Sequence, residues 1–166
     1  MKTSLFMDFV VDKVNKKIKV QREFDASVAD VWEAYTNPEL LDQWWAPKPY
    51  KTVTMSMDFR EGGRWLYYML GPEGNKHYCL AEYKTIQPKK NFSALDAFCD
   101  EKGNINMQLP RAQWFNTFKA NGETTMVSIE IAYDKLEDID KIIEMGFKEG
   151  LSMAMENLDE IFRGRK

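Results

Sequence analysis

Residues 24–65 constrain the possible fold more than any other part of the chain. They read as the end of a strand, two short helices separated at Asn37-Pro38, a Trp-Trp-Ala-Pro exit and a hairpin that contains two glycines. Ser27 is placed to accept the backbone N–H of Asp30 as an N-cap, and Pro38 suits both the end of one helix and the start of the next. The segment therefore predicts two short helices inserted between strands.

Alternation of apolar and polar residues predicts strands on both sides of these helices. A first hairpin is expected within 6–24, and further strands at 51–59, 64–70, 76–86 and 92–99. The ranges 113–119 and 124–133 form a last hairpin, because Asn121-Gly122 suits a tight type I′ turn. The sequence thus predicts an antiparallel sheet.

Apolar residues recur at intervals of three and four from Glu137 to Phe162, which predicts one long helix with an apolar stripe. Its length would be roughly 39 Å, enough to cross a sheet of this size. The fold class is therefore α+β: a curved antiparallel sheet with two short helices and a long C-terminal helix packed on one face.

The 166 residues fit a single domain, 1–166, and contain 44% hydrophobic and 13% aromatic residues. This aromatic content, together with ten methionines, exceeds what simple patterning requires and favours a lined cavity. The alternative is that the large side chains only pack a curved sheet.

Charge and cysteine content exclude several classes of function. With 26 acidic against 23 basic residues, the net charge of −3 disfavours a nucleic-acid partner. No uncharged run is long enough for a membrane span, and the N-terminal stretch has no cleavage pattern, so a cytoplasmic location is expected. Cys79 and Cys99 lie in apolar strand patterns and suit reduced thiols; with His77 as the only histidine, we predict no metal and no cofactor.

Five stretches in a fixed order resemble a known family. They are FDASVADVWEAYTNPELLDQWWAP, MDFREGGRW, AEYKTIQP, FCDEKGN and MGFKEGLSMAMENLDEIF, spread from about residue 20 to 163. Together they resemble helix-grip domains of the START/birch-pollen-allergen superfamily, in the branch similar to the C-terminal domain of the activator of heat-shock-protein-90 ATPase. The resemblance implies six to seven strands that grip the C-terminal helix on the concave face, with a cavity between them that in related families holds apolar molecules.

Period-two alternation selects the side chains that face this cavity. Val127, Ile129 and Ile131 are expected to point inward, which sends Glu130 to solvent. Asp96 shares a face with apolar neighbours, and because a carboxylate facing a core is costly unless it is partnered or wet, it is the acid most readily placed at the cavity. The alternative is a strand end or bulge that lets Asp96 reach water.

The expected ligand-binding residues come from the Trp-Trp exit, the strands and the C-terminal helix. Gly146 and Gly150 either leave room for a ligand or allow close packing of helix on sheet. The full set is Trp44, Trp45, Trp65, Tyr67, Tyr83, Asp96, Phe98, Trp114, Asn116, Met145, Gly146, Phe147, Gly150 and Met153.

No nucleophile elbow, phosphate loop or zinc-protease motif is present, so no catalytic residue is assigned. A binder is favoured over an enzyme, and the absence of a motif does not decide between them. A His77/Asp96 acid–base pair, and Arg64 or Arg111 as a partner for a carboxylated ligand, remain alternatives. The leading hypothesis is a binding protein for a small hydrophobic or amphipathic molecule. The rival hypotheses are a chaperone-associated stress-response module and a cofactor-free hydrolase or cyclase.

Overall fold

The computed structural model describes residues 5–165, and its eight strands form one antiparallel sheet. The strand order is β1-β2-β8-β7-β6-β5-β4-β3. The bounds are β1 Met7–Asp12, β2 Lys17–Phe24, β3 Lys51–Met57, β4 Arg64–Leu70, β5 Lys76–Gln87, β6 Asn91–Phe98, β7 Ala112–Asn121 and β8 Thr124–Tyr133. The predicted antiparallel sheet is confirmed, and eight strands replace the six to seven implied by the resemblance.

Helices α1 (Val28–Thr36) and α2 (Pro38–Trp44) connect β2 to β3, as predicted. The Ser27 side chain accepts the Asp30 backbone N–H at 3.2 Å, so the expected N-cap is confirmed. Pro38 is the first residue of α2, where its missing N–H costs nothing. Asn37 caps α2 by accepting the Glu39 N–H, and both short helices are therefore set by local sequence.

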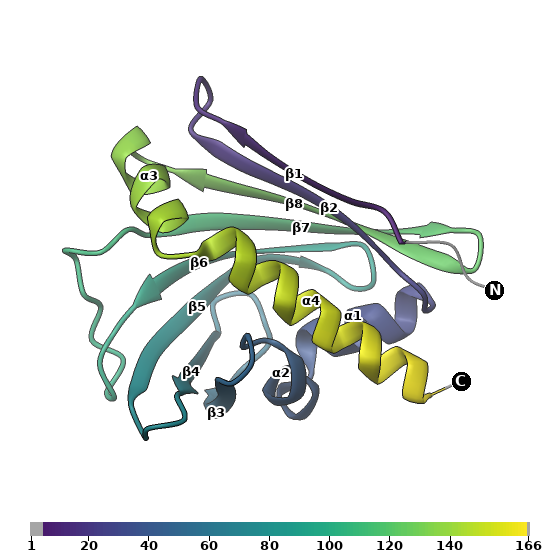
Figure 1. Cartoon of the computed structure of the whole chain (residues 1–166), viewed down its shortest axis with the longest axis horizontal. Coiled ribbons are helices and arrows are strands. Elements are labelled where there is room, and N and C mark those ends of the chain that lie inside the picture. The colour runs from purple at the N-terminus through teal and green to yellow at the C-terminus, as the bar shows by residue number, and fades with distance from the viewer. Residues whose placement is uncertain (1–4, 166) are drawn as a thin grey trace.

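The prediction of one helix over 137–162 is wrong, because the segment forms α3 (Leu136–Glu144) and α4 (Phe147–Gly164). Gly146 separates them with φ of +87°, a left-handed conformation that glycine adopts without steric cost. With 18 residues, α4 is about 27 Å long rather than 39 Å. Figure 1 shows α4 crossing one face of the sheet, with α1 and α2 beside it and α3 turned away near the ends of β1 and β8.

The core lies between the gripping face of the sheet and the helices. Val127, Ile129 and Ile131 of β8 are buried, as predicted, whereas Glu130 points outward and pairs with Lys17. From α4 the buried residues are Leu151, Ala154, Met155, Asn157, Leu158 and Phe162. A helix laid across a curved sheet leaves a space wherever the sheet bends away from it, and that space is the candidate site.

Within residues 5–165, no helix is long and apolar enough to cross a membrane. The expectation that the N-terminal stretch has no cleavage pattern rests partly on residues 1–4. These four residues lie outside the described residues. Lys166 does too.

Candidate functional site

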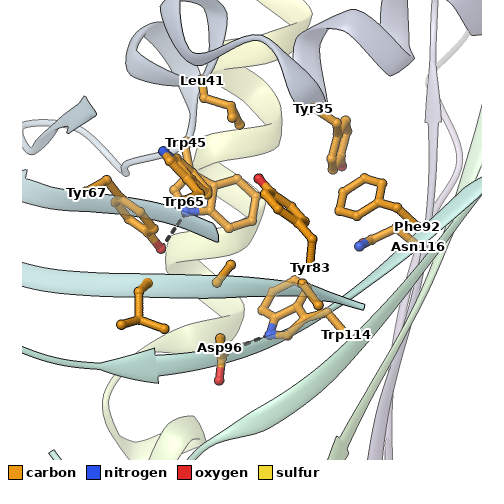
Figure 2. Close-up of a pocket in the computed structure, with 13 residues that line it drawn as sticks. Tyr35, Leu41, Trp45, Trp65, Tyr67, Tyr83, Phe92, Asp96, Trp114 and Asn116 are labelled. Atoms are coloured by element: carbon orange, nitrogen blue, oxygen red, sulfur yellow. Dashed lines mark hydrogen bonds between the residues drawn. The ribbon is translucent and has the colours of Figure 1, made fainter. Parts of the chain in front are cut away.

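Two adjoining chambers lie between the sheet and the helices. The inner chamber, of about 70 Å³, is lined by strands β4 to β7 and by side chains of α1 and α2 (Figure 2). The outer chamber, of about 420 Å³, lies under the junction of α3 and α4 and reaches the exposed His77 and Met145. Four residues line both: Trp45, Tyr67, Asp96 and Trp114. The chambers therefore share a common wall of three aromatic rings and one carboxyl group.

Trp45 occupies the centre of this wall. Its ring lies 5.9 Å from the ring of Trp65 and 5.9 Å from that of Trp114, measured between centroids. Its Nε1–H donates to the Tyr67 hydroxyl at 3.1 Å, so the ring is held by a directed bond as well as by packing. Phe147 of α4 extends the aromatic surface, with its ring 5.9 Å from Trp114. Large rings of this kind give a mainly apolar lining with a few polar tips.

A polar network fixes the position of Trp65. Its Nε1–H donates to Thr54 Oγ1 at 3.1 Å, and Thr54 Oγ1 donates to Asp42 Oδ1 at 2.7 Å. The same Asp42 oxygen accepts the Thr54 backbone N–H at 2.9 Å. This network ties α2 to β3 and the aromatic wall. Sequence reasoning missed Asp42, because nothing local distinguishes it from any other helix-surface acid.

Asp96 faces the chambers from β6 and is held by two short hydrogen bonds. It accepts the Ala112 backbone N–H and the Trp114 Nε1–H, both at 2.7 Å. Burial raises the pKa of the carboxyl to about 6, against the lowering effects of these two bonds and of Arg111. Asp96 is thus partnered, and burial moves the pKa of its carboxyl towards neutrality.

The tyrosines of the site remain neutral hydroxyls at physiological pH. Burial raises the pKa of Tyr67, Tyr83 and Tyr35 above the usual value for a phenol. Burial also raises the pKa of the Cys79 thiol, beside Tyr67, to about 12, although a hydrogen bond with Tyr67 acts in the opposite direction. Cys79 is therefore an unreactive thiol, and both Cys79 and Cys99 are free.

The structure brings most of the predicted site residues together around the two chambers. Trp45, Trp65, Tyr67, Tyr83, Asp96, Trp114 and Asn116 line the inner chamber. Phe98, Met145, Gly146, Phe147 and Gly150 line the outer one.

Two of the predicted residues line neither chamber. Trp44 is fully buried behind Trp45, and its Nε1–H donates to the Ala34 carbonyl oxygen at 2.9 Å, so it seals the core between α1 and α2. Met153 is 41% exposed, because the buried stripe of α4 follows Leu151, Ala154 and Met155 and leaves Met153 beside it. The expectation that both line the cavity is corrected.

Several lining residues were not predicted. Ala81 of β5 shares a face with Tyr83 by simple alternation, so that signal was present in the sequence. Tyr35 and Leu41 reach the inner chamber from α1 and α2, and only the packing of helices on sheet reveals this. Alternation also put Phe92 and Ala94 on the face of Asp96 and Met69 on that of Tyr67, and His77 was an alternative, although none of them entered the predicted set. The other residues missed are Leu80 in the inner chamber, and Pro47, Tyr50, Cys79, Ala97, Pro110, Tyr133, Ile142 and Leu151 in the outer one.

The alternative charged pairs are not formed. Hydrogen bonds join His77 to Asn75 and Asp96 to Ala112 and Trp114, and none joins His77 to Asp96. Arg111 pairs with Glu82 at 2.7 Å, and Arg64 alternates with the inward Trp65 and is exposed. Within residues 5–165, no three His, Cys, Asp or Glu side chains gather closely enough to hold a metal ion.

A sheet that grips a long helix over a lined cavity defines the class of protein: a helix-grip domain. Residues 25–163 match the family model described as Activator of Hsp90 ATPase homolog 1-like protein. The chain belongs to this family, and the resemblance found in its sequence is confirmed.

Solved structures agree with this assignment. The crystal structure of protein Ms6760 from Mycobacterium smegmatis has a TM-score of 0.87 and 30% identity, over 95% of this chain and 96% of that chain. The solution structure of a protein from Arthrobacter aurescens has a TM-score of 0.86 and 28% identity, over 92% and 88%. An AHSA1 protein from Silicibacter pomeroyi, at 14% identity and a TM-score of 0.72 over 90% and 99%, shares the fold. No curated protein matches the chain.

Proposed function

We propose that this protein binds a small apolar or amphipathic molecule in the two chambers between the sheet and α4. The supporting observation is the outer chamber itself, whose volume of about 420 Å³ falls in the usual range for small-molecule sites. Its lining is mainly apolar and aromatic, with few polar groups, which is typical of such sites. Family membership adds support, because helix-grip domains commonly bind hydrophobic ligands.

Gly150 offers a way to test the proposal. A Cβ added there would meet only Pro47 Cγ, at 3.7 Å, so a larger side chain can be built into the outer chamber from α4. We expect Gly150→Leu to weaken naphthalene binding, measured by calorimetry, by about tenfold or more, because it occupies the ligand's volume. Glu149→Leu is the matched control, since Glu149 is an exposed neighbour on the same helix.

Native mass spectrometry provides an independent test. Protein purified without denaturation is expected to carry an additional mass that is lost on unfolding and is reduced in Gly150→Leu. If the wild-type protein carries no additional mass and binds no naphthalene, the proposal is wrong.

The family match supports a second candidate, a chaperone partner, because its description refers to an activator of the Hsp90 ATPase. The discriminating measurement is the ATPase rate of purified Hsp90 with and without this protein. Stimulation that persists in Gly150→Leu would favour a surface interaction over the cavity. An unchanged ATPase rate at saturating protein would contradict this candidate.

A further inference from the structure

Three polar side chains in the inner chamber have no hydrogen-bond partner within residues 5–165. They are Tyr35 of α1, Tyr83 of β5 and Asn116 of β7, which are 5%, 3% and 3% exposed. The Tyr35 hydroxyl is fully enclosed without a partner, whereas the Tyr83 hydroxyl and the Asn116 amide form no hydrogen bond within these residues and keep some accessible surface. Figure 2 shows all three among the residues that line the chamber, with the Phe92 ring between Tyr35 and Asn116 and with Tyr83 on the side of Trp65.

Such groups are uncommon in folded proteins. A buried polar group without a partner forfeits the hydrogen bonds it made with water, so nearly all are paired with protein, solvent or a ligand. Here three of them come from separate elements and line the same small chamber. An aromatic ring or a leucine at these positions would pack equally well without that cost. The Tyr83 hydroxyl and the Asn116 amide, which keep accessible surface in this chamber, therefore indicate a recognition site for a polar group.

The charges around the chamber indicate that this polar group is neutral. No Lys or Arg lines the inner chamber, and the nearby Arg22 is engaged by Asp159. An anionic group would meet the Asp96 carboxyl with no cation to compensate for its loss of water. Hydroxyl and amide side chains offer both donors and acceptors, which suits an uncharged hydroxyl or carbonyl oxygen.

The sizes of the chambers indicate how such a ligand would lie. The inner chamber, of about 70 Å³, has room for only a few atoms, whereas the outer one is about six times larger. Trp45 and Trp114 line both, so a single molecule can extend from one into the other.

We infer that Tyr83 and Asn116, beside the ring of Tyr35, form a specificity site for the uncharged, oxygen-bearing end of the ligand, whose apolar body fills the outer chamber. This inference rests on the proposed binding function. It adds the chemical class of the ligand: a neutral alcohol, phenol or ketone with a bulky apolar part.

Three probes of similar shape test the inference: naphthalene, naphthol and naphthoate. Calorimetric titration of the wild-type protein is expected to give about tenfold tighter binding for naphthol than for naphthalene, the effect of one well-formed hydrogen bond, and the weakest binding for naphthoate. Tyr83→Phe and Asn116→Leu remove the polar atoms and retain the shape. Each is expected to reduce the preference for naphthol to about twofold or less while naphthalene affinity is maintained.

Tyr68→Phe is the matched control, because Tyr68 packs against Tyr78, away from both chambers. It should keep the tenfold preference. The ligand-free stability of Tyr83→Phe separates recognition from a structural role, since a hydroxyl without a partner is removed without loss and the melting temperature should be unchanged or higher.

The outcomes distinguish this inference from the proposed function. Equal binding of naphthalene and naphthol, unaltered in both variants, would overturn the specificity site and leave the binding function standing. Tightest binding of naphthoate would overturn the assignment of a neutral ligand. Failure of all three probes to bind would contradict the binding function and this inference together.

Discussion

Asp96 is a carboxyl group that the fold removes from water. Its carboxyl is buried, accepts two hydrogen bonds and has its pKa raised from 3.8 to about 6, mainly by burial. The folded protein therefore takes up a proton at Asp96 at a higher pH than the unfolded chain does. Burial of the charged form costs stability at neutral pH, and protonation relieves that cost.

A pH titration of stability checks this conclusion. The free energy of unfolding of the wild type, compared with Asp96→Asn, should increase as the pH falls from about 7 through 6 towards 4. The gain should be up to about 3 kcal/mol, since each pKa unit corresponds to about 1.4 kcal/mol. Urea denaturation at several pH values is the measurement.

Asp12 provides a control of opposite sign. A side-chain hydrogen bond from Asn15 is the main reason that the pKa of Asp12 lies below its usual value. The stabilising contribution of Asp12 should therefore be lost as the pH falls through its folded pKa, so that the advantage of the wild type over Asp12→Asn decreases. Parallel pH profiles for Asp96→Asn and Asp12→Asn would contradict both assignments.

Trp44 and Trp45 are adjacent in sequence but differ in role. Trp44 seals the core through its bond to the Ala34 carbonyl oxygen, whereas Trp45 lines both chambers. We expect Trp44→Phe to lower the free energy of unfolding by about 2 kcal/mol, through the lost bond and the cavity left behind, with little effect on naphthalene affinity. Trp45→Phe should instead weaken naphthalene binding clearly and lower the free energy of unfolding only slightly. Denaturant unfolding and calorimetry on both variants decide between these roles, and equal effects in both assays would contradict them.

At the scale of elements, the break between α3 and α4 shapes the outer chamber. Gly146 holds the left-handed conformation that ends α3 and begins α4, and it lines that chamber together with Met145 and Phe147. Gly150 lies within α4, where its φ is helical. The sequence alone does not distinguish the two glycines, because both fall within the one helix that it predicts. In the structure they have different roles.

Alanine substitution separates these roles. Gly146→Ala should cost about 1–2 kcal/mol, because an L-residue in the left-handed region brings its Cβ close to the backbone. Gly150→Ala should raise stability by up to about 1 kcal/mol, because alanine is the better helix former and the added Cβ meets only Pro47 Cγ, at 3.7 Å. Thermal or urea unfolding measures both. Destabilisation of similar size at the two positions would show that Gly150 is required for close packing.

Much of the element order could be predicted because its signals are local. The Ser27 cap, Pro38 and the Asn121-Gly122 turn act through neighbours in the chain, and their elements were predicted nearly to the residue. The break at Gly146 could not be predicted in the same way, since apolar spacing continues across it. Likewise, alternation predicted that Asn116 faces the cavity. The sequence could not show that its amide lacks a hydrogen-bond partner, because this depends on every element packed around it.

At the scale of the whole molecule, a buried ion pair joins the N-terminal part of the sheet to the C-terminal helix. Arg22 of β2 binds Asp159 of α4, with side chains only 8% and 12% exposed. Arg22 also donates to the Glu23 carbonyl oxygen and lies over the Phe24 ring. Because both charges are removed from water, each depends on the other.

Asp159→Ala should lower the free energy of unfolding by about 3 kcal/mol or more, because it leaves Arg22 buried without its counterion. The double variant Arg22→Met/Asp159→Leu should lose clearly less than the sum of the two single changes. Glu160→Ala, which breaks the exposed pair with Lys48, is the control and should change stability by less than about 1 kcal/mol. Additive losses in the double variant would contradict this coupling.

The pairing of β2 with β8 also governs how the chain reaches its fold. The pair runs from Lys17↔Ala132 to Phe24↔Thr125, so its strands come from opposite ends of the sequence, about 100 residues apart. The entropy of closing so long a loop must be overcome before the contacts are gained, which slows folding relative to local hairpins. On a ribosome, the hairpin of β1 and β2 emerges before β8 and cannot complete its pairing until β8 has been synthesised. The space between sheet and helix can therefore form only after both β8 and α4 have been synthesised.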